Sequence, residues 1–184
     1  MAGPVLTTAR LILRPMVVDD FDPWAEAMAD EEAMKFLGGP QARSVAWRGF
    51  VGAAGSWTIL GFGMFSVIER SSGRWVGRVG PHRPEGWPGE EVGWMIARPA
   101  WGQGYAGEAA AASMDFAVDE LGWTRVIHCI DAGNIASQGV AMHLGSERAG
   151  TAKMPAPMDE EIEVWAQSAD KWRAFRTSRR RAAS

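Results

Sequence analysis

One stretch of the chain, residues 90–112, constrains the fold more than any other. It begins as an apolar run that holds the β-branched and aromatic residues Val92, Trp94 and Ile96. It then breaks at Pro99 and passes through three glycines into an alanine-rich segment. An apolar run, a glycine turn and an alanine-rich run in this order predict a strand, a tight turn and the start of a helix.

The glycine turn is a candidate anion site. The first N–H groups of a helix have no partner inside the helix, and the helix dipole adds partial positive charge there. A phosphate suits this position, and Gly102 and Gly104 would let the backbone approach its oxygens without an intervening Cβ. A tight connection without a ligand is the alternative. A P-loop or a dinucleotide fold fits less well, because the glycines are not followed by G-K-[S/T] and the stretch lies in the middle of the chain.

Three ordered motifs carry a resemblance to a known family. The string W-G-Q-G-Y-A-G-E-A begins at Trp101, N-I-A-S spans residues 134–137 with H-L-G at residues 143–145, and T-x-R-L-x-L-R-P spans residues 8–15. Together they closely resemble the GNAT superfamily of N-acetyltransferases, in the branch typified by the ribosomal-protein N-terminal acetyltransferases RimJ and RimL. In that family the first string is the loop that binds the acyl-CoA pyrophosphate.

The pattern of elements and the resemblance predict the same fold class. Strand-like and helix-like segments follow one another as in an α/β (α+β) protein with a mixed, mainly antiparallel central sheet flanked by helices. The resemblance adds that the sheet is splayed at the cofactor strand. At 184 residues, 47% of them hydrophobic, the chain is expected to form one domain over residues 1–175. The arginine-rich residues 176–184 are expected to be a basic, disordered tail.

Periodicity and turn residues place the individual elements. Besides the central strand that Glu91 opens, strands are expected at residues 10–14, 61–69, 74–79, 126–130, 147–153 and 162–167. Helices are expected around residues 21–28, 31–37 and 45–51, and at residues 108–121 and 135–144. His82 falls in an expected Pro/Gly loop. By resemblance, the early helices form one wall of the acceptor site.

Charge and composition exclude several classes of partner. The formal net charge of −3 gives no basic field, so no nucleic-acid or membrane partner is expected. The one cysteine, Cys129, excludes an intramolecular disulfide framework and is expected to be buried and inert. Without an apolar run of about 18 residues, a cytoplasmic protein is expected. Ten tryptophans are unusual, and some are expected to line an acceptor groove.

By resemblance, acetyl-CoA is the co-substrate and no metal is needed. The backbone of Met95, Ile96 and Ala97 would bind pantetheine as an added strand does. Amides of the glycine turn would face the pyrophosphate, and these belong to Gln103, Gly104, Tyr105, Ala106, Gly107 and Glu108. Asn134 would contact the pantetheine arm, and its alternative is a helix cap. The branch usually has Thr or Ser at Gly107, which allows a CoA affinity weaker by about 1 kcal/mol.

Glu91 and Ser137 are the expected catalytic residues. The family often draws a carboxylate base from the start of the central strand, so Glu91 is the first candidate. His82 is the second, because an unperturbed histidine has a pKa near 6.5. Many GNAT enzymes have a tyrosine where this chain has Ala141, and that tyrosine acts as the acid for the leaving thiolate. In the Rim-like branch a serine at the position of Ser137 is the usual candidate for this role. A surface glutamate and a merely solvated serine are the alternatives. By the family pattern, the Ile96 N–H is the oxyanion donor.

The resemblance implies transfer of an acetyl group from acetyl-CoA to a primary amine, on a protein N-terminus or a small molecule, by direct attack in a ternary complex. Cys129 lacks a partner histidine at a recognisable spacing, which argues against a covalent intermediate. His128 and His143 are expected to be structural, and Gly145-Ser146 replaces the more frequent Gly-Phe. Three alternatives stay open: a CoA-binding regulatory protein, an enzyme for a larger acyl-CoA such as succinyl-CoA, and a nucleotide-binding module. A homodimer is common in this branch.

Overall fold

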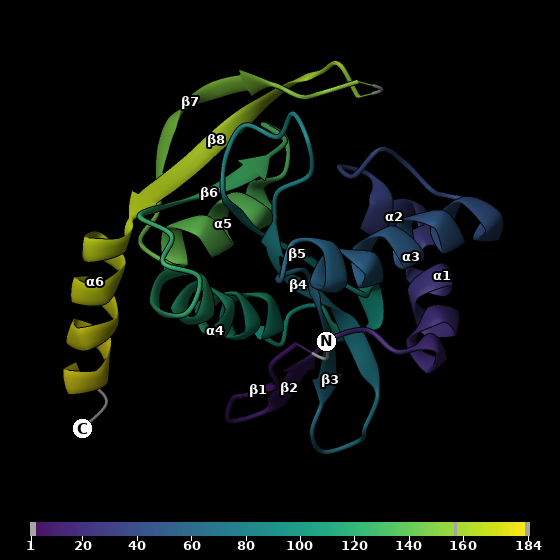
Figure 1. Ribbon diagram of the computed structural model, residues 1–184, viewed down its shortest axis with the longest axis horizontal. Coiled ribbons are helices and arrows are strands. Elements are labelled where there is room, and N and C mark those ends of the chain that lie inside the picture. Colours follow the sequence, from purple (N-terminus) through teal and green to yellow (C-terminus); the bar gives the residue numbers. More distant parts are fainter. Residues whose placement is uncertain (1–2, 157, 183–184) are drawn as a thin grey trace.

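The computed structural model describes residues 3–156 and 158–182, and an eight-stranded sheet forms its centre (Figure 1). The strands lie in the order β1-β2-β3-β4-β5-β6-β8-β7. They are β1 (Leu6–Thr7), β2 (Leu11–Arg14), β3 (Phe65–Glu69), β4 (Trp75–His82), β5 (Glu91–Ile96), β6 (Arg125–Ile130), β7 (Glu147–Lys153) and β8 (Glu161–Ser168). β5 and β6 pair in parallel and the other neighbours are antiparallel. The predicted fold class is therefore confirmed.

Helices pack on the sheet from different sides (Figure 1). They are α1 (Phe21–Ala29), α2 (Glu31–Met34), α3 (Arg43–Ile59), α4 (Tyr105–Asp119), α5 (Ile135–His143) and α6 (Ala169–Ala182). Val92 and Ile96 of β5 pack in the apolar cluster that contains α4, whereas Met95 packs in the cluster formed mainly by α1, α2 and α3. Because side chains alternate along a strand, Glu91 lies on the same face of β5 as Met95.

The sheet opens between β5 and β6, as predicted. The two strands pair only at Glu91 and Ile127, where the Ile127 N–H donates to Glu90 at 2.9 Å. Beyond that point side chains take the place of the backbone ladder. His128 Nδ1 lies 2.7 Å from the Val92 carbonyl oxygen, and the Trp94 ring packs 4.9 Å from the His128 ring, centre to centre. The half-buried Trp94 ring and the buried His128 ring therefore fill the gap where β5 and β6 no longer pair.

The C-terminal segment forms a helix where the sequence predicts a disordered tail. Helix α6 continues to Ala182, so that prediction is wrong for residues 176–182. The Arg176 guanidinium pairs with Asp115 at 2.7 Å and with Asp119 at 2.5 Å. These carboxylates belong to α4 and lie far away in sequence, so local composition does not reveal them. Residues 183–184 lie outside the described residues, and the single-domain extent stays a prediction.

Two element boundaries differ from expectation in ways that affect the site. β4 extends to His82, so this histidine lies in a strand directly opposite Glu91 rather than in a loop. α4 begins at Tyr105, three residues before the predicted start at residue 108. Among the described residues, no helix combines the length and the apolar character that crossing a membrane requires.

Candidate active site

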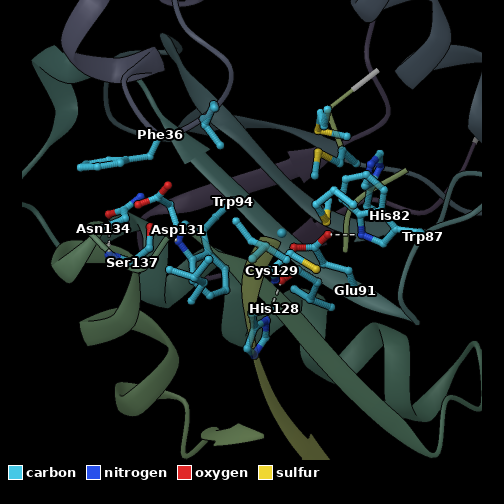
Figure 2. Close-up of a pocket in the computed structure, with 18 of the residues that line it drawn as sticks. Phe36, His82, Trp87, Glu91, Trp94, His128, Cys129, Asp131, Asn134 and Ser137 are labelled. Atoms are coloured by element: carbon cyan, nitrogen blue, oxygen red, sulfur yellow. Dashed lines mark hydrogen bonds between the residues drawn. The ribbon is translucent and has the colours of Figure 1, made fainter. Parts of the chain in front are cut away.

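Two cavities meet at the open edge of β5. The first, here called the α4 cavity, has a volume of about 550 Å³ and is lined by Met95, Ile96, Trp101, Gly104, Ala106 and Val140, among others. The second, the Glu91 cavity, has a volume of about 200 Å³ and is lined by Arg78, His82, Trp87, Glu91, Cys129 and Met154, among others (Figure 2). Five residues line both cavities: Phe36, Leu37, Trp94, Asn134 and Ser137. The two cavities are therefore neighbours that share these residues.

The start of α4 offers unpaired backbone donors to the α4 cavity. Gly104 is the N-cap residue with φ +74°, a conformation that favours glycine. The Glu108 N–H makes the first bond inside the helix, to the Gly104 carbonyl at 3.2 Å. Within the described part of the chain, the N–H groups of Tyr105, Ala106 and Gly107 meet no acceptor. These three donors fit a phosphate, whereas the Glu108 amide does not, because the helix starts earlier than predicted.

The Glu108 side chain fastens the glycine turn to the N-terminal motif. Its carboxylate accepts from Thr8 Oγ1 at 2.5 Å, from the Arg10 N–H at 2.9 Å and from Arg10 Nε at 2.6 Å. Burial raises the pKa of Glu108, but the hydrogen bonds from Thr8 and Arg10 outweigh burial and lower it overall. Arg10 also donates to the Gln103 carbonyl at 2.8 Å. Two of the sequence motifs are thereby one structural unit at the anion site.

The backbone of β5 is only partly free to bind a ligand. The Ala97 N–H donates to the Val76 carbonyl at 2.9 Å, so it is directed to β4. Successive N–H groups along a strand point to opposite neighbours. The Met95 N–H is therefore directed to β4 as well, whereas the Ile96 N–H is directed to the open edge. The Ile96 carbonyl accepts from Trp101 Nε1 at 2.7 Å. Of the three residues predicted to bind pantetheine, Ile96 therefore has the available N–H, and Trp94 is the second edge residue.

Asn134 and Ser137 lie at the junction of the two cavities. Asn134 caps α5, with its Oδ1 accepting from the Ser137 N–H at 3.1 Å, so the capping alternative is confirmed. Ser137 Oγ accepts from Trp94 Nε1 at 3.2 Å. Because Trp94 Nε1 is a donor only, the Ser137 hydroxyl hydrogen is left to donate toward the junction. Figure 2 shows Asn134 and Ser137 together on the far side of Trp94 from Glu91.

Glu91 is a buried carboxylate, only 6% exposed, at the point where β6 leaves β5. Oε1 accepts from the Cys129 N–H at 2.9 Å, and Oε2 accepts from Trp87 Nε1 at 2.5 Å (Figure 2). Burial raises the pKa of Glu91 to about 7, although both bonds and the nearby Arg78 oppose the shift. The surface-glutamate alternative is therefore wrong. A carboxylate with this pKa can accept a proton near neutral pH.

His82 lines the same cavity but is a weaker base. It lies across from Glu91, and its ring packs edge-on against the Trp87 ring at 4.8 Å. Burial and the Arg78 charge lower the pKa of His82 to about 4. A group with such a low pKa is neutral at pH 7 and holds an abstracted proton poorly, so Glu91 remains the first candidate for the base.

Comparisons with known proteins agree with this geometry. Residues 10–147 match the family described as "Acetyltransferase (GNAT) domain". The chain belongs to the GNAT acetyltransferase family. It is 26% identical to the uncharacterized N-acetyltransferase YnaD of Bacillus subtilis, covering 85% of this chain and 90% of that one. It is 36% identical to YkkB of the same organism, but over only 46% of this chain and about half, 51%, of that relative.

Solved structures of GNAT proteins share the fold. An acetyltransferase from Agrobacterium tumefaciens superposes with a TM-score of 0.79 at 28% identity, covering 91% of this chain and 95% of that one. An aminoglycoside acetyltransferase in complex with coenzyme A superposes with a TM-score of 0.75, covering 90% and 99%. Its identity of 15% shows the fold alone. The ribosomal-protein branch stays a prediction.

Gly107 stands where the branch usually has threonine or serine, and a neighbouring side chain explains the glycine. A Cβ at this position would lie 3.3 Å from His143 Cδ2 of α5, tighter than ordinary contact. His143 Nε2 in turn lies 3.0 Å from Arg179 of α6. Burial and the Arg179 charge lower the pKa of His143. His143 thus crowds the position where a threonine or serine would place its Cβ. The structural role of His143 stays a prediction.

The Gly145-Ser146 departure is compensated by a buried polar network. Ser146 Oγ lies 3.0 Å from His128 Nε2 and accepts from Gln167 Nε2 at 2.9 Å. His128 is 1% exposed, and burial lowers its pKa to about 4, which agrees with a structural role. Cys129 differs from its prediction, because it is half-buried and lines the Glu91 cavity. Burial and the Glu91 charge raise the pKa of the Cys129 thiol, so it stays protonated.

Sequence reasoning missed Arg78, Trp87 and Trp94 as site residues. The abundance of tryptophan was a signal for an aromatic groove, but only the fold assigns Trp94 of β5 and Trp87 of the β4–β5 loop to it. Nothing in the local sequence distinguishes Arg78 from the chain's other arginines. Among the described residues, no group of three or more His, Cys, Asp or Glu side chains could hold a metal ion.

Proposed function

We propose that the protein transfers an acetyl group from acetyl-CoA to a primary amine by direct attack in a ternary complex. The observation that carries this proposal is the junction of the two cavities at Trp94, Asn134 and Ser137. The α4 cavity has free N–H groups that suit a phosphate, and the Glu91 cavity has a carboxylate that can take a proton. Family membership supports the use of an acyl-CoA.

Glu91 is the proposed base, acting directly or through one water. Each of its oxygens accepts one protein hydrogen bond and keeps a second lone pair for the incoming ammonium. With a pKa of about 7, proton transfer from an α-ammonium near pKa 7.8 is uphill by about 1 kcal/mol. Transfer from a lysine ammonium near pKa 10.4 is uphill by roughly 5 kcal/mol. The site therefore suits an amine of low pKa.

Backbone and hydroxyl donors complete the proposed transfer. The Ile96 N–H, free at the open edge of β5, polarises the thioester carbonyl. Glu91 takes one proton from the incoming ammonium and releases it to solvent. The amine nitrogen then forms the new C–N bond while the C–S bond breaks, and Glu91 takes the second proton from that nitrogen. Ser137 Oγ–H donates a hydrogen bond to the departing sulfur, and solvent returns the proton to the thiolate. Holding the two reactants at the cavity junction supplies most of the acceleration.

Calorimetric titration with acetyl-CoA tests the binding step on which the whole proposal depends. Ala106→Glu places a carboxylate among the free N–H groups of α4, so we expect affinity to fall at least tenfold through repulsion of the phosphates. Ala111→Glu is the matched control, because Ala111 is another half-buried alanine of α4 that does not line the cavity. Circular dichroism checks that both variants fold.

Parallel titrations decide between acetyl-CoA and its rivals. Succinyl-CoA, ATP and NAD are titrated under the same conditions, and release of free thiol is followed with a panel of amines. Tight binding of ATP or NAD without binding of acetyl-CoA would overturn the proposal in favour of a nucleotide-binding module. Binding of acetyl-CoA with no thiol release from any amine would favour a regulatory CoA-binding protein. The homodimer and the ribosomal-protein acceptor stay predictions.

A further inference from the structure

Arg78 is a cation in the Glu91 cavity that has no carboxylate partner. Within residues 3–156 and 158–182 it forms no ion pair, unlike Arg14 at the end of β2 or Arg74 just before β4. Its NH1 approaches only the Met64 sulfur, at 2.9 Å, and its guanidinium lies 4.9 Å from the centre of the Trp24 ring. Its Nε is buried and has no hydrogen-bond partner among the described residues. Buried polar groups in proteins are nearly always paired, so this site lacks an acceptor.

The cavity around Arg78 has an uncompensated positive charge. Burial lowers the pKa of Arg78 to about 10, partly opposed by Glu91, so the guanidinium is charged at pH 7. Glu91 lies beyond ion-pair distance, and its oxygens are engaged by Cys129 and Trp87. Two other carboxylates line the cavity, but Glu160 is exposed and Asp131 is half exposed and accepts from the Gly133 N–H at 2.7 Å. Solvent screens both of them.

Between Arg78 and Glu91 the two paired strands contribute only glycine, and the end of the Met64 side chain lies over it. Arg78 lies opposite Met95 on the paired strands, and His82 lies opposite Glu91, with Gly93 between. A Cβ on Gly93 would be 3.0 Å from Met64 Cε and 3.4 Å from Glu91 Oε1. The glycine therefore makes room for the end of the Met64 side chain beside Glu91. This flexible thioether is the group that a small molecule spanning the carboxylate and the guanidinium would displace.

The size and lining of the cavity limit what that molecule can be. About 200 Å³ is below the roughly 300–1,000 Å³ of ordinary ligand pockets, so the acceptor is small. Apolar side chains form much of the remaining wall, among them Phe36, Trp87, Met154 and Ile162. A polyamine or another polycation would meet the Arg78 charge without compensation.

We propose that Arg78 binds the carboxylate of a small amino acid with an apolar side chain, whose α-amine lies at Glu91. This inference rests on the proposed acetyl transfer and names its acceptor. In a free amino acid the carboxylate raises the pKa of the α-ammonium above that of a protein N-terminus. Pairing with Arg78 offsets this negative charge and lowers the amine pKa toward the range that Glu91 can deprotonate. The guanidinium can bind a carboxylate through two parallel hydrogen bonds.

Acetyl transfer to matched acceptors tests the inference. Thiol release from acetyl-CoA is measured with leucine, methionine and phenylalanine, with the carboxamide of each, and with spermidine. We expect kcat/KM to be at least tenfold higher for each acid than for its carboxamide, mostly through KM, as loss of a charge-assisted hydrogen bond predicts. Equal or better use of the carboxamides, or faster use of spermidine, would overturn the inference.

Variants assign the preference to one side chain. Arg78→Gln should reduce the acid-to-carboxamide ratio to about one, and Arg78→Lys should retain part of it. Arg83→Gln is the matched control, because Arg83 pairs with Glu90 at 3.2 Å and does not line the cavity, and its ratio should equal that of the parent. A ratio that survives Arg78→Gln in a variant with unchanged thermal unfolding would contradict the assignment.

Binding measured without turnover separates the two proposals. Leucine and leucinamide are titrated into the CoA-saturated protein, with tryptophan fluorescence as the signal, because Trp87 and Trp94 line the cavity. Acid-selective binding that depends on Arg78, without acetyl transfer, would support this inference and reject the proposed function. Acetylation of uncharged or cationic amines, without a preference for the acids, would support the proposed function and reject this inference.

Discussion

The two cavities at β5 are built from different parts of the chain. The α4 cavity takes its polar groups from backbone, namely three N–H groups of α4 and the open edge of β5. The Glu91 cavity takes its polar groups from side chains on β4, β5 and the loop between them, chiefly Arg78, Glu91 and Trp87. Backbone donors need only a chain path with glycine, whereas side-chain groups can be substituted without changing that path. We infer that the first cavity recognises the common acyl donor and the second selects the acceptor.

Substituting Glu91, the proposed base, should have the largest effect on activity and should leave the α4 cavity unaffected. In Glu91→Gln we expect kcat to fall by about 10²- to 10⁴-fold, as loss of a general base does. The acetyl-CoA dissociation constant should change less than twofold, because Glu91 does not line the α4 cavity. Steady-state kinetics and calorimetry measure the two quantities. Full activity in Glu91→Gln, with loss of activity in His82→Gln, would move the base to His82.

The same substitution should change the pH dependence of stability. Between the ordinary glutamate pKa of 4.5 and about 7, the folded chain holds a proton on Glu91 that the unfolded chain has released. The stability contributed by this group therefore falls as pH rises through that window, by about 3 kcal/mol in total. His82 and His128 act in the opposite direction, because their pKa values are lowered to about 4.

Only the difference between the parent and Glu91→Gln isolates the carboxylate. Urea unfolding at several pH values should show Glu91→Gln gaining about 3 kcal/mol relative to the parent between pH 4.5 and pH 8. A difference that does not vary with pH would mean that the pKa of Glu91 is not raised by folding.

Weakening the contacts that hold the glycine turn should reduce acetyl-CoA affinity moderately and should not affect the Glu91 cavity. Glu108→Gln weakens the bonds from Thr8 and Arg10, so we expect acetyl-CoA affinity to fall several-fold, with about 1 kcal/mol of lost stability. Glu163→Gln breaks a comparable pair with Arg148 away from the cavities and should lose stability without losing affinity. Equal affinity losses in both variants would show that the anchoring is not specific to the turn.

The smallest effect concerns Gly107. Gly107→Ser alone should leave acetyl-CoA affinity within about twofold, because His143 fills the space beside it. Combined with His143→Ala, the serine hydroxyl has room to bond a phosphate, and we expect a gain of about 1 kcal/mol beyond the His143→Ala variant. A double-mutant cycle measures this coupling. Additive effects would show that His143 does not constrain the position.

The sequence predicted the donor side better than the acceptor side for a physical reason. The strand, the glycine turn and the first turn of α4 are continuous, so residues 90–112 contain their own signals. The helix start was placed too late, which made the Glu108 amide a wrong candidate. Strand pairing also directs the N–H groups of Met95 and Ala97 to β4. The partners of Glu91 come from β4, β6 and the preceding loop. The sequence of any one of these segments does not determine how the strands pair, so these contacts could not be predicted. The same holds for α6, whose Arg176 is paired by distant carboxylates.

The most direct test of Glu91 as the base is the pH dependence of kcat. It is measured with an acceptor amine that is itself deprotonated throughout the range from pH 6 to pH 9, so that the substrate does not titrate. We predict that the parent enzyme's kcat rises through an apparent pKa near 7 to a plateau and that Glu91→Gln stays low and flat. The same rising limb in both proteins, or a flat profile in the parent, would contradict that role.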